Sequence, residues 1–461
     1  MIDTFLRRPK GYPHVIKRLR TLPPVFLYGL FVTLLTVMVV VISGAILQVA
    51  LRGQGRSLGF GTTVTRSTAM GSTAIPTATP IILPTGTITK LPSNLSDTSS
   101  NIHLGLSFDS YISNFASLNH TIDVVWAAKN AASVPGAFTV SYNPSERIGN
   151  AATGPLYSFD WFVQNHPDWI IYKCNRATPA FGFGEANTPL DITNVDVLQF
   201  LLTQQFVPQI NAGYKGIGID NVGFQNQWGR CGHFDKTNTW VPLYTGLYED
   251  PAYQQSILTW AQRIYAIIKN ANPHVAVVMN ISFDQSHSTL WSQMLPNMDL
   301  LVDEAGFSNF GDANFPYATD GSWLSHYTFL QQFQQSSGNG VFIINQVPNN
   351  IVTSSQLQWA LANYLLIKGQ HSYITVVGKQ QYGQFFDHPE YHILIGQPLN
   401  YTTTDGCIYQ RNYSNGIVLV NPSSQVSCAV TFSQPYKTSA GISIYSTTVP
   451  PHTGVTLFIS P

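Results

Sequence analysis

From residue 102 onward, short apolar runs alternate with longer stretches in which apolar residues recur every three or four positions. Short runs of this kind are typical of parallel strands that are buried on both faces of a sheet. Eight runs fit this description, at 102–106, 122–126, 169–172, 216–219, 275–279, 300–302, 341–344 and 372–376. The alternation predicts an α/β fold.

The clearest helical stretch is 252–269, in which Ile257, Ala261, Ile264 and Ile268 recur at the spacing of one helix face. Strands and helices that alternate over about 280 residues match a (β/α)8 TIM barrel, which typically takes about 250 residues. We therefore expect a TIM barrel over residues 101–399. A doubly wound open sheet is the alternative, although no GxGxxG motif opens the first strand–helix turn of a dinucleotide-binding version.

The pattern changes after residue 400. Runs at 407–413 and 416–420 are β-like and are joined through Asn415-Gly416, a strong signal for a hairpin turn. Three more short runs follow, at 428–432, 441–445 and 454–459. We expect residues 400–461 to form a small antiparallel, β-sandwich-like domain packed on the barrel. Its expected role is structural, with sugar binding as the alternative.

The N-terminal region contains a long apolar segment. No charged residue lies between Arg20 and Arg52, and residues 25–51 are almost wholly apolar. A helix of this length, rising about 1.5 Å per residue, crosses the roughly 30 Å hydrocarbon core of a bilayer with some tilt. The segment therefore predicts a transmembrane signal anchor, with cleavage after it as the alternative.

Charge and composition around this segment predict its orientation. Basic residues are denser in the leader, 1–24, than on the far side, and this bias favours a cytoplasmic N-terminus. The rest of the chain is then extracellular and held at the cell membrane by a single pass. Residues 52–100 are rich in Thr, Ser, Pro and Gly without sustained periodicity, so we expect a disordered, flexible linker.

Overall composition limits the partners. The chain has 23 Lys and Arg against 23 Asp and Glu, and only 10% of its residues are charged. The basic face that marks nucleic-acid binding is therefore not expected. Aromatic residues make up 12% of the chain and accompany many Asn, Gln, Ser and Thr residues, which suits a neutral, hydroxyl-rich ligand.

Four cysteines, Cys174, Cys231, Cys407 and Cys428, lack CxxC spacing and a zinc-like Cys/His cluster, so no structural metal is expected. In an exported protein they would form disulfides, and the domain boundaries favour the pairs Cys174–Cys231 and Cys407–Cys428. Four buried thiols are the alternative.

Functional groups of a TIM barrel gather at the carboxyl ends of its strands. The polar residues directly after the apolar runs are Asp109, Lys129, Asp220, Asn221, Asn280, Asp303, Glu304, Asn345 and Gln346. From this region we expect six residues to contact substrate, namely Asp109, Trp126, Lys129, Asn221, Asn280 and Asn345. The alternative is a structural ion pair for Asp109 and Lys129, and core packing for Trp126.

Two carboxylates, Asp220 and Glu304, are the candidate catalytic residues. They follow the fourth and sixth predicted strands, and alternate strands of a barrel contribute to the same layer of side chains. Adjacent strand residues point to opposite sides, so only one of Asp303 and Glu304 faces the centre. We expect Glu304 to do so, and Asp303 to cap a helix or bind a backbone group. Paired carboxylates predict glycoside hydrolysis, with helix capping or ion pairing as the alternative.

Four short segments carry a family resemblance: PLDITN at 189–194, GIGIDNV at 216–222, VDEAGF at 302–307 and GIVLVNP at 416–422. Over residues 101–461 the chain resembles glycoside-hydrolase-like TIM-barrel families related to endo-α-1,4-polygalactosaminidases and, more distantly, to the α-galactosidase clan. In that clan the nucleophile follows the fourth strand and the acid/base the sixth, and configuration is retained. The resemblance implies that Asp220 is the nucleophile and Glu304 the acid/base, although the clan more often has Asp at the second position.

Together these patterns predict a membrane-anchored, outward-facing glycosidase that cleaves a polysaccharide. Glu304 would protonate the leaving oxygen while Asp220 attacks the anomeric carbon, without a cofactor or metal. The alternative is a surface barrel that binds carbohydrate without cleaving it.

Overall fold

The computed structural model describes residues 102–109, 118, 121–145, 147–148, 157–182, 187–311, 320–337, 339–399 and 403–459. The predicted anchor at 25–51 and linker at 52–100 lie outside these residues. None of the helices in the described ranges is both long and apolar enough to span a bilayer.

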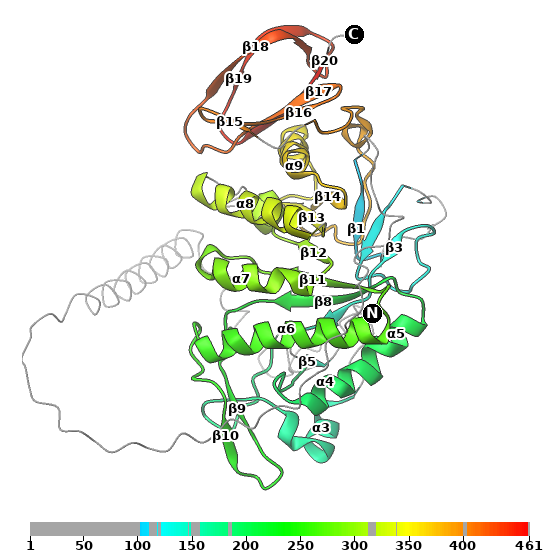
Figure 1. The fold of residues 1–461 in the computed structure, drawn as a ribbon, viewed down its shortest axis with the longest axis vertical. Helices are drawn as coiled ribbons and strands as arrows, with labels where there is room; N and C mark the ends of the chain where they lie inside the picture. The colour runs from blue at the N-terminus through cyan, green and yellow to red at the C-terminus, as the bar shows by residue number, and fades with distance from the viewer. Residues whose placement is uncertain are drawn as a thin grey trace, which may run out of the picture. The chain divides into compact units, whose positions relative to one another are not determined.

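A ring of parallel strands forms the centre of the fold (Figure 1). One sheet has the strand order β14-β13-β12-β11-β8-β4, and a second has the order β1-β2-β3. Parallel bridges join the two sheets at Leu104–Ile374 and at Val140–Gly216. The strands of this ring are β1 (Gly105–Ser107), β2 (Val124–Trp126), β3 (Phe138–Thr139), β4 (Asn143–Pro144), β8 (Gly216–Val222), β11 (Ala276–Ile281), β12 (Leu300–Asp303), β13 (Gly340–Val347) and β14 (Ser372–Gly378).

Seven of the eight predicted strands lie in this ring, but the predicted third strand, 169–172, does not. Tyr172 begins β6 (Tyr172–Lys173), which pairs antiparallel with β9 (Arg230–Phe234) in a small peripheral sheet completed by β10 (Trp240–Pro242). The third position in the ring is taken by β3 and β4 in series. Their segment alternates apolar and polar residues, because polar side chains such as Ser141 face Gln209 of helix α5 (Val207–Asn211), to which Ser141 donates a hydrogen bond of 2.7 Å.

Helices follow the ring strands from the third position to the seventh. They are α3 (Phe159–Asn165), α4 (Val195–Leu201), α5, α6 (Pro251–Ala271), α7 (Ser288–Met294), α8 (Asp320–Ser337) and α9 (Ser354–Ile367), with a π-helical turn at Leu202–Phe206 between α4 and α5. In Figure 1, α6, α7 and α8 run roughly parallel to one another beside the strands, whereas α9 is seen nearly end-on. The connection 127–137 between β2 and β3, all of it described, contains no helix. The α/β fold with a parallel sheet is confirmed, with a helix layer that is less regular than the eightfold repeat predicts.

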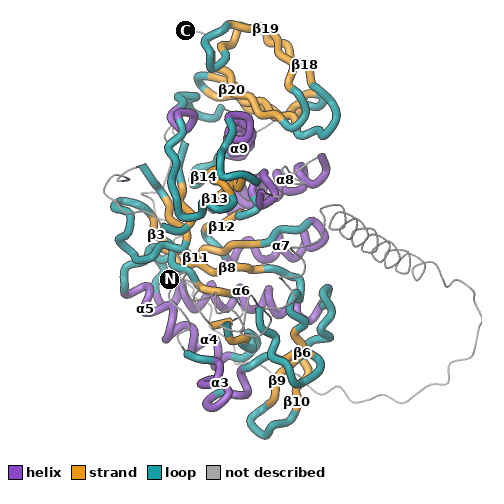
Figure 2. The backbone as a smooth tube through the Cα atoms, turned by 180° about the vertical axis from the view of Figure 1, so that it is seen from behind, coloured by secondary structure: helices purple, strands orange, loops and turns teal. Residues whose placement is uncertain are grey.

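The expected antiparallel β structure at the C-terminus is present as one six-stranded sheet. This sheet has the order β15-β16-β17-β20-β18-β19 and lies beyond α9 in both views (Figures 1 and 2). That it forms a separate, sandwich-like domain stays a prediction. The bounds are β15 (Thr403–Asp405), β16 (Ile408–Tyr413), β17 (Gly416–Asn421), β18 (Cys428–Lys437), β19 (Ser443–Val449) and β20 (Thr453–Ile459). A short antiparallel pair, β5 (Arg147–Ile148) with β7 (Thr188–Pro189), is separate from the ring and from the C-terminal sheet.

The C-terminal domain is fastened to helix α9 by buried polar groups. Arg411 of β16 donates from Nη1 to the backbone carbonyls of Leu365, Leu366 and Lys368, at 3.2, 3.2 and 2.7 Å. These carbonyls lie at the C-terminal end of α9, where helix carbonyls lack partners within the helix. The Tyr413 hydroxyl adds a 2.6 Å hydrogen bond to Leu365.

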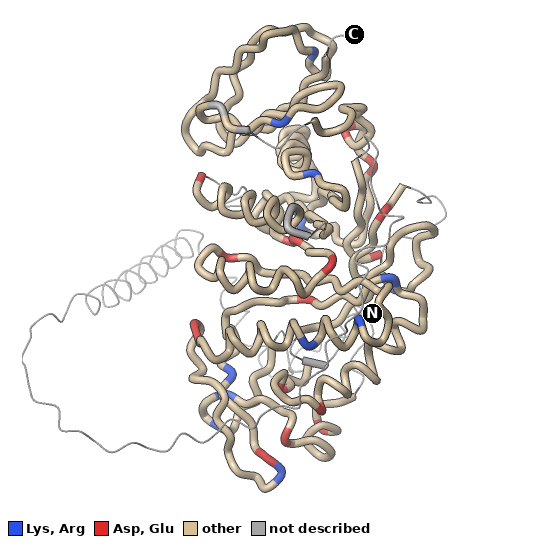
Figure 3. Tube along the Cα trace, in the orientation of Figure 1, with Lys and Arg blue, Asp and Glu red and all other residues tan. Residues whose placement is uncertain are grey.

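Both predicted disulfides are present, Cys174–Cys231 and Cys407–Cys428. The first joins the segment after β6 to β9, and the second lies within the C-terminal domain. Figure 3 shows Lys and Arg distributed over several elements of the described chain, with acidic residues among them.

Candidate active site

Polar side chains form the last inward-facing layer at the carboxyl ends of the ring strands. One layer below, Val140, Val278, Val302 and Ile344 belong to the apolar cluster that fills the ring, and Gly218 of β8 lies at the same level, paired with Val278. Because side chains alternate along a strand, residues two positions further along face the same way. These residues are Tyr142, Asp220, Asn280, Glu304 and Gln346.

Asn280 lies between the two predicted catalytic acids. Its Nδ2 atom donates to Asp220 Oδ1 at 2.7 Å and to Glu304 Oε2 at 2.7 Å. Because both oxygens lie 2.7 Å from the same nitrogen, they are at most 5.4 Å apart (2.7 + 2.7). The structure thus brings together Asp220, Asn280 and Glu304, from β8, β11 and the end of β12.

Asp220 is surrounded by hydrogen-bond donors. The Tyr142 hydroxyl donates to Asp220 Oδ2 at 2.6 Å, and the Asn221 amide donates to the same oxygen. With Asn280, three side chains donate to this carboxylate, which is 7% exposed. Asn221 itself has a φ of 59°, a left-handed conformation that Asn tolerates better than most residues. Donors to both oxygens stabilise the negative charge of Asp220.

Glu304 has a different environment. The Tyr382 hydroxyl donates to Glu304 Oε1 at 2.5 Å, and Gln346 Nε2 donates to that hydroxyl at 2.6 Å. Burial is the main cause that raises the pKa of Glu304; the Tyr382 hydrogen bond opposes it, and the nearby charge of Asp220 adds to it. Burial and the charge of Glu304 also raise the pKa of Tyr382, so this phenol stays a donor.

Aromatic rings pack beside the two acids. Phe108, directly after β1, lies 5.7 Å from the Tyr382 ring and 5.9 Å from the Tyr142 ring, between centroids. Phe108 has a φ of 58°, and a bulky residue in this region is strained, as often occurs at functional sites. Trp126 lies 6.2 Å from Tyr142 and is 1% exposed, so it packs inside the ring rather than presenting an open stacking face.

The remaining predicted residues lie outside this cluster. Asp303 faces away from the ring centre, as expected: it accepts from the Gly306 backbone N–H at 3.1 Å and pairs with His326 of α8 at 3.0 Å. Asn345 is fully buried and accepts from the Phe307 backbone N–H at 2.9 Å. Its side chain supports the turn after β12, so substrate contact by Asn345 has no support in this position.

Asp109 and Lys129 meet through the backbone. Asp109 is 1% exposed, and its Oδ1 accepts from the Lys129 backbone N–H at 2.9 Å. The Lys129 side chain is exposed, and the described residues show no ion pair between the two side chains. Their contact with substrate stays a prediction.

Sequence reasoning missed Tyr142 and Tyr382 and passed over Gln346. Tyr142 lies in the unrecognised third strand, where a period-2 pattern was the available signal. Gln346 stands at a strand end like the residues that were chosen, and the alternation from Ile344 would have favoured it over Asn345. Tyr382 follows β14 in a segment without periodicity, so no local signal marks it. No group of three or more His, Cys, Asp or Glu within the described ranges is arranged to hold a metal.

No family model matches the chain, and no curated protein matches it. In structure it is similar to 350 solved chains, and the three described next are glycoside hydrolases. The maltogenic α-amylase AmyB from Thermotoga neapolitana has a TM-score of 0.44 and 13% identity, covering 78% of this chain and 99% of its own. Amy13B from Eubacterium rectale has a TM-score of 0.45 and 8% identity, and the match covers 79% of this chain and 97% of its own. A GH27 β-L-arabinopyranosidase from Geobacillus stearothermophilus has a TM-score of 0.40 and 11% identity, and the match covers 71% of this chain and 74% of its own. Likenesses this weak identify no family, so the function is inferred from the chain's own residues.

Proposed function

We propose that the chain is a retaining glycoside hydrolase that cleaves a polysaccharide. The observation that carries this proposal is the shared Asn280 nitrogen, which limits the distance between one oxygen of each acid to 5.4 Å. Retaining glycosidases place their carboxyl groups about 5–5.5 Å apart, whereas inverting enzymes need about 6.5–9.5 Å to admit a water. The TIM-barrel glycosidase families that the sequence resembles fit this proposal.

The environments of the two acids favour one division of roles. Asp220 accepts from three side-chain donors, which stabilises the carboxylate that a nucleophile must be. The raised pKa of Glu304 favours a protonated carboxyl, as a general acid requires. Asp220 is therefore proposed as nucleophile and Glu304 as acid/base.

The proposed reaction has two steps. In the first, Asp220 forms a bond to the anomeric carbon while the glycosidic C–O bond breaks, and Glu304 transfers its proton to the departing oxygen. In the second, Glu304 takes a proton from water as that water attacks the anomeric carbon and releases Asp220. Asn280 contacts both acids throughout, and Tyr382 orients Glu304.

We further propose that the enzyme works outside the cell, held at the membrane by residues 25–51. The apolar segment and the basic leader support this location. Two disulfides are expected in an oxidising, extracellular compartment and rare in the cytosol.

The test is to incubate the purified chain with a panel of polysaccharides and to assay new reducing ends. Asp220→Asn and Glu304→Gln should each lower turnover at least about 100-fold, as loss of a positioned acid or base does. With an aryl glycoside, whose leaving group departs without a proton, azide should rescue Glu304→Gln with retained configuration and Asp220→Asn with inverted configuration.

Asp303→Asn is the matched control, since it changes the neighbouring carboxylate on the opposite face of the strand. It should keep most of the turnover. Wild-type turnover in Asp220→Asn would remove this residue from catalysis. Sugar binding without new reducing ends, unchanged in both amide variants, would replace the proposal with a non-catalytic carbohydrate-binding protein.

A further inference from the structure

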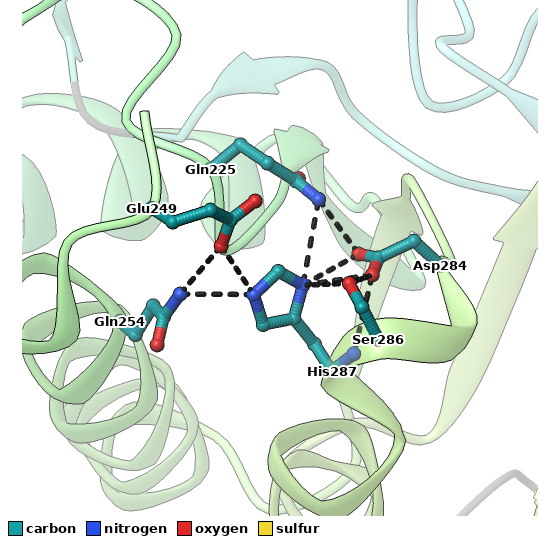
Figure 4. Close-up of polar contacts among 6 residues, drawn as sticks. All are labelled: Gln225, Glu249, Gln254, Asp284, Ser286 and His287. Carbon is teal, nitrogen blue, oxygen red and sulfur yellow. Dashed lines mark hydrogen bonds and ion pairs between the residues drawn. The ribbon is translucent and has the colours of Figure 1, made fainter. Parts of the chain in front are cut away.

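A second polar cluster, separate from the acid pair, is centred on His287 (Figure 4). The ring Nδ1 lies 2.8 and 2.9 Å from the two carboxylate oxygens of Asp284, and Nε2 lies 2.7 Å from Glu249 Oε2. The His287 side chain is 8% exposed. Each ring nitrogen therefore faces a carboxylate oxygen in a nearly closed site.

A carboxylate oxygen at each ring nitrogen favours a charged ring. A neutral imidazole carries one N–H, and only the doubly protonated ring donates from both nitrogens. The other described residues that contact the ring are uncharged, namely Phe224, Gln225, Gln254 and Ser286. Asp284 and Glu249 are thus the titratable groups that face the ring. Burial opposes the charged form, but hydrogen bonds and charges from these two carboxylates outweigh it and raise the pKa of His287.

The cluster joins two connections that leave the candidate active site. Asp284 and His287 follow β11, which carries Asn280. Glu249 comes from the connection between β8, which carries Asp220, and α6, directly before the α6 N-cap residue. The segment 243–250 also holds two exposed apolar side chains, Leu247 and Tyr248.

We propose that His287, as an imidazolium, is a positioning residue of the active site, because it latches segment 243–250 onto the connection after β11. This role rests on the proposed glycosidase function. The latch holds the strand-end connections of β8 and β11 in one arrangement beside Asp220 and Asn280.

Gln254 defines what happens when the ring loses a proton. Its Nε2 lies 2.9 Å from both His287 Nε2 and Glu249 Oε2. Once His287 Nε2 is deprotonated, the Gln254 amide becomes the donor to this nitrogen, and Glu249 loses its ring donor. Glu249, which is 53% exposed, then keeps only the Gln254 donor and can turn into solvent, so segment 243–250 loses its side-chain contact with the connection after β11.

The sign of the pH dependence follows from the raised pKa of His287. The latch is complete below the ordinary histidine value of about 6.5 and is lost as pH rises through the raised value. The pKa of Asp284 is lowered, because its hydrogen bonds outweigh its burial, so acid breaks the contact between Asp284 and His287 only below the ordinary aspartate range.

The experiment measures hydrogen exchange of segment 243–250 against pH in the full chain, after correction for intrinsic exchange. The variants are His287→Gln and Glu249→Gln, and the control is His392→Gln, which removes a histidine from an exposed pair with Asp387. In the wild type and the control, exchange should rise at least about tenfold across the His287 titration, as for loss of roughly one hydrogen bond. Both latch variants should exchange fast at every pH, and NMR of the His287 ring should show it titrating above the ordinary histidine value of about 6.5.

Activity supplies the second readout. In the wild type, KM should rise at alkaline pH, where the latch opens. The latch variants should raise KM more than they lower kcat, and their KM should not rise further at alkaline pH. Equal exchange profiles in Glu249→Gln and wild type would overturn the latch. Altered exchange with an unchanged KM profile would overturn the positioning role. A wild type that cleaves no glycan refutes the proposed function and with it the positioning role, while the exchange profile still decides whether the latch exists.

Discussion

The buried ion pair between Lys269 and Asp299 gives a prediction that depends on no substrate. Lys269 Nζ in α6 lies 2.7 Å from Asp299 Oδ2, and the two side chains are 1% and 0% exposed. Asp299 also accepts from the Val277 backbone N–H at 2.8 Å and from the Tyr265 hydroxyl at 3.2 Å. The pair thus joins the end of α6 to the start of β11 and β12.

Lys269→Met keeps much of the side-chain volume but leaves Asp299 as a buried carboxylate without its cation. Breaking a buried pair from one side costs about 3–5 kcal/mol. Asp299→Asn should cost a similar amount, because it leaves Lys269 buried without its anion. In the double variant no charge remains, and the Asn carbonyl still accepts from Val277. The double variant should therefore be no less stable than the worse single variant.

Urea unfolding followed by tryptophan fluorescence measures the three free energies of unfolding. With an m-value of about 3 kcal/mol/M, each single variant should lower the midpoint by about 1 M or more. Asp387→Asn, in an exposed pair with His392, is the control and should change stability by no more than about 0.5 kcal/mol. Additive losses in the double variant would refute the reasoning, since they would show that the two charges do not compensate each other.

Three further predictions concern the site and the C-terminal domain. Tyr382→Phe removes a hydrogen bond that lowers the pKa of Glu304, so the alkaline limb of the kcat/KM profile should move to higher pH; an unmoved limb would contradict the proposed acid role. Arg411→Met removes the charged donor from three carbonyls of α9, and thermal unfolding should show a loss of about 2 kcal/mol or more, with normal stability as the contrary result. Replacing Cys407 and Cys428, 21 positions apart, by Ser should cost about 3 kcal/mol in denaturant unfolding and leave turnover at low temperature unchanged; a large loss of turnover would link this domain to catalysis.

Hydrophobic patterning predicted the elements whose buried residues form an uninterrupted apolar run or a regular helical period. The central strands β8, β11, β12, β13 and β14 are apolar on both sides, and α6 has a clear helical period, so local sequence identified them. The third ring strand was missed because its outward side chains are polar. Ser141 and Asn143 bond to Gln209 of α5, a partner distant in sequence that makes polar residues acceptable in a buried strand.

The candidate site was predictable to the same extent. Asp220 and Glu304 were identified because each follows an apolar run that ends in an acidic residue. The alternation of side chains along a strand correctly predicted that Glu304, and not Asp303, faces the ring centre. Tyr382 donates to Glu304 from 78 positions away in the sequence, and no sequence pattern near either residue predicts that contact. Residues chosen by position along a strand are therefore predictable, whereas those brought in by chain segments beyond the strands are not.

The closing strand has a consequence for the newly made chain. Leu104 bridges Ile374, so the first and last strands of the ring meet only after the 270 positions that follow Leu104 have been synthesised. Tyr382, which orients Glu304, emerges later still, and the domain anchored by Arg411 comes after it. A polypeptide that stops short of Ile374 holds both acids in a ring that is still open, and one that stops short of Tyr382 lacks this donor to Glu304. The proposed catalytic site is therefore complete only once the chain has been made through Tyr382.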